Sequence, residues 1–134
     1  MKVLVDTCIW SLALRRKTPR ENTIILQLRE LIDESRVQML GPIRQEILSG
    51  IPATEHFDSV RKYLAAFKDQ PLVENDYEVA AELYNVCRKK GIQGSNTDFL
   101  ICAAAINYKM AIFTSDNDFA LYAKSMPIKL MTVS

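Results

Sequence analysis

The sequence of 134 residues has few of the residue types that build zinc sites and disulfide frameworks. It contains one histidine, His56, and three cysteines, Cys8, Cys87 and Cys102, with no CxxC pair. An odd number of scattered cysteines argues against a disulfide framework and favours a reducing compartment. A structural zinc site is also disfavoured, because it needs a cluster of Cys and His ligands.

Long hydrophobic runs are also absent. The longest strongly apolar stretch covers residues 99–106, far fewer than the roughly 18 residues that indicate a membrane span. The apolar run after Lys2 is interrupted at Asp6, so the N-terminus does not resemble a signal peptide. We therefore expect a cytoplasmic protein without a membrane partner.

The overall composition is that of an ordinary globular protein. Hydrophobic residues make up 49% and charged residues 25% of the chain, and we expect residues 1–134 to form a single domain. The formal net charge of +1 neither indicates nor excludes a nucleic-acid partner, so that question depends on local charge.

Apolar patterns typical of strands and of helices alternate along the chain. Val3, Leu4 and Val5 form an unbroken apolar run, as in a central parallel strand that is buried on both faces. The predicted strands are residues 3–5, 36–40, 110–113 and 128–133. The predicted helices are residues 7–14, 21–35, 42–49, a segment capped by Thr54 that carries Phe57, Val60, Leu64 and Phe67, residues 76–90 capped by Asn75, 97–108 and 116–124. This alternation predicts an α/β fold with a central parallel sheet.

Four acidic residues follow predicted strands or lie in the helices beyond them: Asp6, Glu46, Asp98 and Asp116. Carboxyl ends of parallel strands meet at one edge of a sheet, where α/β proteins bind ligands. Each acid alone also fits a helix cap or a solvated residue. Together they would repel one another unless a pKa rises or a cation binds. An all-oxygen set of this kind suits Mg²⁺ or Mn²⁺.

Four short motifs carry a family resemblance: VLVDTCIW, PIRQEILSG, TDFLICAAA and TSDNDF. In this order they resemble the PIN-domain ribonucleases, and the compact chain is most similar to the VapC-type toxins of toxin–antitoxin pairs. The resemblance implies a PIN-like α/β/α sandwich with the first strand central. The chain departs from the commonest pattern only mildly, with Cys8 at a position where a small residue is usual.

The same resemblance implies a metal-dependent endoribonuclease. Asp6, Glu46, Asp98 and Asp116 would hold Mg²⁺, or Mn²⁺, for hydrolysis of RNA phosphodiester bonds, through one metal ion or two. Thr7 and Thr114 match hydroxyl positions that support the site, and Asp118 matches a further acid of varying role. The implied partners are an RNA substrate, a VapB-like antitoxin and a second copy of the chain in a homodimer.

Basic residues near the predicted site are candidates for RNA contact: Arg15, Arg16, Lys17, Arg20 and Arg44. A solvated charge run is the alternative interpretation of the first four. Trp10 could stack on a base, but its place after an apolar segment favours core packing.

Three other functions are open to comparison. A phosphatase of the haloacid-dehalogenase type needs a second Asp two residues after the first, where this chain has Cys8. A phosphate-transfer receiver domain needs a Lys after a late strand, which the segment FTSDND lacks. A non-catalytic RNA- or protein-binding module with the same fold is the main alternative to a nuclease, and Mn²⁺ binding would distinguish the two.

Overall fold

The computed structural model of the chain describes residues 1–15 and 18–131. Strands and helices alternate along it, and the strands form one parallel sheet. The strands are β1 (Val3–Val5), β2 (Val37–Gln38), β3 (Ala111–Phe113) and β4 (Lys129–Met131). The helices are α1 (Thr7–Ala13), α2 (Thr23–Asp33), α3 (Gly41–Ser49), α4 (Thr54–Leu64), α5 (Glu74–Lys89), α6 (Asn96–Asn107) and α7 (Asp118–Tyr122).

Strand β1 lies inside the sheet, whose order is β2-β1-β3-β4. Leu4 stands opposite Gln38 of β2 and Ile112 of β3. Val3, Leu4 and Val5 are fully buried, because this strand has protein on both of its faces. The predicted α/β fold with a parallel sheet and a central first strand is confirmed.

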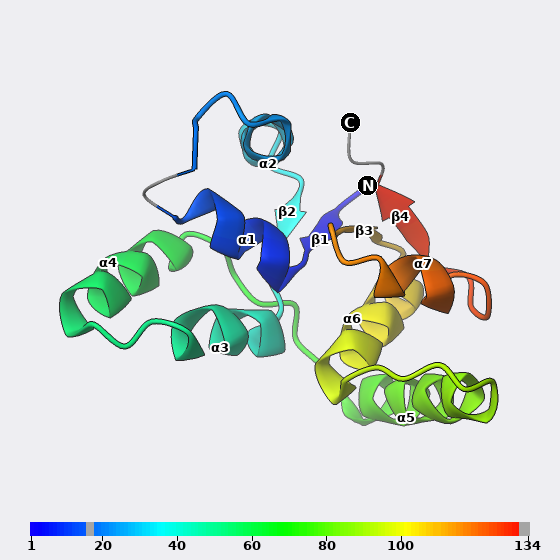
Figure 1. The fold of residues 1–134 in the computed structure, drawn as a ribbon. Helices are drawn as coiled ribbons and strands as arrows, with labels where there is room; N and C mark the ends of the chain where they lie inside the picture. Colours follow the sequence, from blue (N-terminus) through cyan, green and yellow to red (C-terminus); the bar gives the residue numbers. More distant parts are fainter. Residues whose placement is uncertain (16–17, 132–134) are drawn as a thin grey trace.

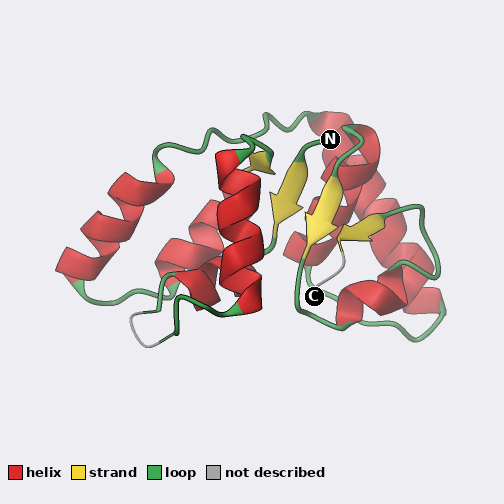
Figure 2. Ribbon diagram, turned by 90° about the horizontal axis from the view of Figure 1, so that it is seen from above, coloured by secondary structure: helices red, strands yellow, loops and turns green. Residues whose placement is uncertain are grey.

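Helices lie on both sides of the strands (Figure 2). In Figure 1, α1, α3 and α4 lie to the left of the sheet, and α5, α6 and α7 lie at the lower right. Helix α6 packs against α5 and β3, and its side chains Cys102 and Ala105 are fully or almost fully buried. Small side chains allow this close approach, and the prediction that Cys102 fills the core is confirmed.

Several observed elements are shorter than predicted. Helix α2 begins at Thr23 because the side chain of Asn22 accepts hydrogen bonds from the backbone N–H groups of the first turn. Strand β2 is two residues long, since Met39 forms only an isolated bridge with Asp69. The end of the strand predicted at 128–133 lies outside the described residues.

Two predicted helix caps are wrong. Thr54 is the first residue of α4, and Ala53 occupies the cap position; residues 52–55 are exposed, so water can satisfy the first N–H groups. Asn75 lies inside α5. The backbone N–H of Val73 instead donates to the carboxylate of Asp76, at 2.8 Å, and the helix starts two residues earlier than predicted.

Trp10 lies in the core, as predicted. Its side chain is fully buried and its indole N–H donates to the carbonyl oxygen of Val5 at 3.1 Å. The ring packs edge-on against Phe67, with 5.1 Å between ring centroids. Phe67 follows α4 instead of lying on its face, so the aromatic contact ties the segment after α4 to α1.

Arg44 of α3 connects this helix to the segment after α4. Its Nε and Nη2 atoms donate to Oδ1 of Asp69 at 3.0 and 2.9 Å. Its guanidinium also donates to the backbone carbonyl oxygens of Leu64, at 3.0 Å, and Phe67. These partners all belong to the protein, so the guanidinium of Arg44 is held between α3 and the segment after α4, and its contact with RNA stays a prediction.

Candidate metal centre

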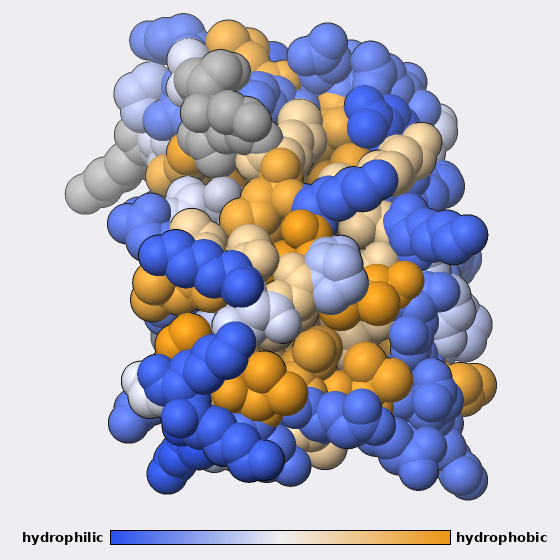
Figure 3. Space-filling view, turned by 90° about the vertical axis from the view of Figure 1, so that its right-hand side faces the viewer, coloured by the Kyte–Doolittle hydropathy of each residue, from blue (hydrophilic) through white to orange (hydrophobic). Residues whose placement is uncertain are grey.

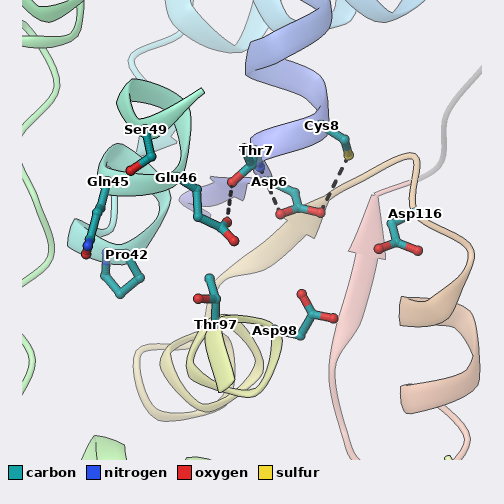
Figure 4. A pocket seen from close by; sticks show the side chains of 10 residues that line it. All are labelled: Asp6, Thr7, Cys8, Pro42, Gln45, Glu46, Ser49, Thr97, Asp98 and Asp116. Carbon is teal, nitrogen blue, oxygen red and sulfur yellow. Dashed lines mark hydrogen bonds between the residues drawn. The ribbon is translucent and has the colours of Figure 1, made fainter. Parts of the chain in front are cut away.

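The four predicted acids line one pocket of about 630 Å³ (Figure 4). Asp6 follows β1, Glu46 lies in α3, Asp98 lies in the first turn of α6, and Asp116 lies in the loop after β3. The other lining residues are Thr7, Cys8, Pro42, Gln45, Ser49 and Thr97. Residues up to 110 positions apart in the chain thus meet where the central strands end.

Asp6 is the most buried of these acids, with 6% of its surface exposed. Its Oδ1 accepts a hydrogen bond from the backbone N–H of Thr7, and its Oδ2 accepts one from the Thr114 hydroxyl, both at 2.8 Å. Burial raises the pKa of Asp6, the hydrogen bonds from Thr114, Thr7 and Cys8 oppose that rise, and the negative charge of Asp98 adds to it. Asp6 is therefore fixed in place at a cost in desolvation.

Thr7 connects two of the acids. Its backbone N–H binds Asp6, and its hydroxyl donates to Oε1 of Glu46 at 2.7 Å (Figure 4). Thr114 plays a similar part on the other strand, because its hydroxyl oxygen accepts the backbone N–H of Asp116 at 3.0 Å while donating to Asp6. The two threonines that the sequence proposes as supports therefore contact the predicted acids.

Asp118 does not line the pocket. It is exposed at the start of α7, and its backbone N–H donates to Oδ1 of Asp116 at 2.9 Å. Its contact with the site is therefore made by the backbone.

Asp98 is placed by Ser95, whose hydroxyl accepts a hydrogen bond from the backbone N–H of Asp98 at 3.1 Å and caps α6.

The pocket offers oxygen ligands that suit Mg²⁺ or Mn²⁺. Among the residues that the structure describes, no group of three or more His, Cys, Asp or Glu side chains is arranged to hold a metal ion directly. Mg²⁺ usually keeps several water molecules and binds protein through one or two carboxylates. The residues present fit such a partly hydrated ion.

Sequence reasoning left Cys8 without a role, although it lies two residues after Asp6 and lines the same pocket. Its thiol lies 3.5 Å from Oδ2 of Asp6 and accepts a hydrogen bond from the Ser115 hydroxyl at 3.3 Å. The two-residue spacing could have indicated that Cys8 lies beside Asp6, because both residues stand at the N-terminal end of α1.

Iodoacetamide is expected to alkylate Cys8 in the folded protein and to prevent Mn²⁺ binding, because the adduct would occupy the pocket. Cys87 and Cys102 should not react, since both are fully buried and burial raises the pKa of each thiol. Mass spectrometry of peptides identifies the labelled residue, and Cys8→Ser is the resistant control. Full Mn²⁺ binding by protein alkylated at Cys8 would contradict the pocket geometry.

Of the basic candidates, Arg15 shares a surface hollow with one of the acids, Glu46. It is exposed and lines a second hollow of about 560 Å³ that shares Glu46 with the acidic pocket. Arg20 is exposed in the following loop. Arg16 and Lys17 lie outside the described residues.

The chain is thus an α/β protein with a parallel sheet and an acidic pocket at the carboxyl ends of its central strands, where proteins of this class bind ligands. The family model described as the PIN domain matches residues 3–125. The chain therefore belongs to the PIN domain family. No curated protein sequence matches it.

Solved structures share the fold over nearly the whole chain. FitAcB from Neisseria gonorrhoeae is 18% identical over 97% of this chain and 96% of its own, with a TM-score of 0.78. VapBC2 from Rickettsia felis, bound to a promoter DNA fragment, is 18% identical over 98% of both chains, with a TM-score of 0.79. VapC20 from Mycobacterium tuberculosis, described as a sarcin–ricin loop cleaving toxin, is 15% identical over 96% of this chain and 99% of its own, with a TM-score of 0.70.

Proposed function

We propose that the protein is a Mg²⁺-dependent endoribonuclease that acts as the toxin of a type II toxin–antitoxin pair. The observation that carries this proposal is the pocket lined by Asp6, Glu46, Asp98 and Asp116, from four separate segments of a PIN domain. Mn²⁺ can replace Mg²⁺ in an oxygen site of this type. The RNA-cleaving toxin among the similar folds supports the choice of reaction.

Some carboxylate oxygens of the four acids are held by hydrogen bonds within the protein, and others are available to bind water or a cation. Both oxygens of Asp6 accept hydrogen bonds, so this carboxylate holds a set position. The described structure records no hydrogen bond to Oε2 of Glu46, Oδ1 of Asp98 or Oδ2 of Asp116, so these atoms can hold a water molecule or accept its proton. When bound, Mg²⁺ supplies the positive charge that activates the water and stabilises charge developing on the phosphate.

RNA needs positive charge beside an acidic pocket, and Arg15 offers it. Arg15 and Glu46 line the same second hollow, so a strand whose phosphate enters the acidic pocket would pass close to this cation. Arg20, Arg16 and Lys17 belong to the same basic segment of the sequence. We propose this segment as the RNA contact, since salt-sensitive phosphate contacts dominate such binding.

The proposed partners are a VapB-like antitoxin and a second copy of the chain. The similar folds include toxin–antitoxin complexes, some of them bound to DNA. Apolar side chains gather on the face that Figure 3 shows, which lies at the right of Figure 1, and such patches mark surfaces for protein contact.

We also propose a cytoplasmic location. Among the described residues, no helix has the length and apolar character to cross a membrane.

The proposed activity is tested by incubating the purified protein with RNA in Mg²⁺ or Mn²⁺ and sequencing the ends that form. Cleavage is expected with either ion, leaving 5′-phosphate and 3′-hydroxyl ends. Excess EDTA is expected to stop it and added Mn²⁺ to restore it. Cleavage that persists unchanged in EDTA would overturn the assignment of a metal-dependent nuclease.

A non-catalytic RNA- or protein-binding module is the second candidate. It is favoured by the lack, in the described residues, of three side chains arranged to hold a metal directly. Titration with Mn²⁺ alone separates the two functions. RNA or protein binding without any Mn²⁺ binding would favour the second candidate.

A further inference from the structure

Tyr122, the last residue of α7, donates a hydrogen bond to one of the acids of the pocket. Its hydroxyl lies 2.7 Å from Oδ2 of Asp98, whereas its distance from the Gln93 carbonyl oxygen is 3.5 Å. The shorter contact is the stronger one, because a phenol donating to a carboxylate forms a charge-assisted bond. Tyr122 is fully buried and does not line the pocket, so this bond reaches Asp98 from behind.

The tyrosine ring is held in one place by its neighbours. Its centroid lies 5.0 Å from that of Phe99 and 5.1 Å from that of Phe119. Gly94 closes the third side. A Cβ at Gly94 would collide with the Tyr122 hydroxyl and stand 2.8 and 2.9 Å from ring atoms of Phe99, so the loop lies directly on the two rings. The hydroxyl therefore has little freedom to turn from Asp98.

In this bond the Tyr122 hydroxyl is the donor and the Asp98 carboxylate is the acceptor. Burial raises the pKa of Tyr122, and the hydrogen bond to Asp98 together with its negative charge raises it further. Asp118 and Asp116 add to this effect, so α7 and the loop before it surround the hydroxyl with negative charge. A protonated phenol fixes one carboxylate oxygen and leaves the other to the pocket.

We propose that Tyr122 is a positioning residue for Asp98, whose Oδ2 it holds so that Oδ1 faces the acidic pocket and takes a divalent cation or its bound water. This inference rests on the proposed function of that pocket. Figure 4 shows Asp98 across the pocket from Asp6, with Glu46 on one side and Asp116 on the other. Groups that orient metal ligands typically contribute 10–100-fold to metal affinity.

The chain supplies a matched control at the other end of α6. The hydroxyl of Tyr108 donates to Oδ2 of Asp76 at 2.8 Å, and neither residue lines the acidic pocket. Tyr122→Phe and Tyr108→Phe thus remove the same atom from the same kind of bond. Only the first change touches a proposed metal-site acid.

The experiment is a titration of the full chain with Mn²⁺ in the absence of RNA. Isothermal titration calorimetry or electron paramagnetic resonance measures the Kd. Tyr122→Phe is expected to raise the Kd for Mn²⁺ at least about 10-fold, and Tyr108→Phe to leave it unchanged. Metal-free melting curves show whether each variant is folded. A purely structural role for Tyr122 would lower the melting temperature and leave the Kd of the folded protein as it was.

An unchanged or lower Kd in folded Tyr122→Phe would overturn the inference, while normal Mn²⁺ binding by the unsubstituted chain would keep the proposed metal site. No Mn²⁺ binding by the unsubstituted chain would overturn both. If Tyr122→Phe does not fold, Gly94→Ala provides the same test, because the added Cβ displaces the hydroxyl without removing it. A Kd equal to that of the unsubstituted chain would then also overturn the inference.

Discussion

Asp6→Asn is expected to lower the rate of RNA cleavage at least roughly 100-fold and to raise the melting temperature of the metal-free protein by a few degrees. The first effect follows because the amide removes one negative charge from the pocket. The second follows because Asp6 is 6% exposed, and an ionised carboxylate is expensive to bury. Cleavage assays and calorimetry in EDTA measure the two effects.

The stability gain should depend on pH and on metal. Because burial raises the pKa of Asp6 in the folded protein, the carboxylate does not oppose folding below its unfolded pKa of about 3.9 and opposes it as pH rises through the folded value. The advantage of Asp6→Asn should therefore be present near neutral pH and vanish in acid. Saturating Mn²⁺ should reverse the order, since only the unsubstituted protein is stabilised by binding.

The control for this prediction is Asp33→Asn. Asp33 is exposed at the end of α2 and does not line the acidic pocket, so the same chemical change should leave cleavage and stability as they were. Cleavage at the full rate by folded Asp6→Asn would show that the pocket is not the catalytic centre. A lower metal-free melting temperature would show that the Asp6 hydrogen bonds outweigh its desolvation.

Asp76→Ala is expected to lower the free energy of unfolding by about 2 kcal/mol or more. The Asp76 carboxylate accepts hydrogen bonds at 2.8 Å from the Val73 backbone, the Asn107 amide and the Tyr108 hydroxyl. It thus joins the start of α5 to the end of α6. Alanine leaves these donors without their acceptor. Urea unfolding at neutral pH measures the loss, and Glu78→Ala, which removes an exposed acid of the same helix, is the control.

The effect of Asp76 should also depend on pH, with the opposite sign to that of Asp6. Burial alone would raise the pKa of Asp76, but hydrogen bonds from Asn107, Val73 and Tyr108 outweigh burial and lower it. Its stabilisation is therefore complete above the unfolded pKa of about 3.9 and is lost as pH falls through the lowered folded value. A difference between the two proteins that stays constant from pH 7 into strong acid would contradict a role for the charge.

Local pattern was enough to predict the arrangement around β1. The run Val3 to Val5 has only one good environment, the interior of a parallel sheet, and Asp6 must then stand at its carboxyl end. Helix starts were harder to predict. Thr54 and Asn75 are good capping residues by type, but the positions of α4 and α5 follow from exposure and from Asp76, which sequence spacing does not reveal.

In the candidate site, too, local sequence pattern predicts some features, and others depend on contacts between distant residues. The approach of Asp6, Glu46, Asp98 and Asp116 to one pocket could be predicted, because each acid follows a strand or lies in a helix beyond one. The hydrogen bonds between Arg44 and Asp69 could not be predicted, since the two residues lie 25 positions apart in the chain. Nothing in the sequence indicated the hydrogen bond between Tyr122 and Asp98, because it depends on how α7 packs against Phe99 and Gly94.

The hydrogen bond between Thr114 and Asp6 joins residues 108 positions apart. Strand β1 likewise finds its neighbour β3 only after residue 113 has been made. During synthesis, the amino-terminal half of the pocket leaves the ribosome long before the groups that complete it. A nascent chain therefore has no assembled acidic pocket until Asp116 has been added to it.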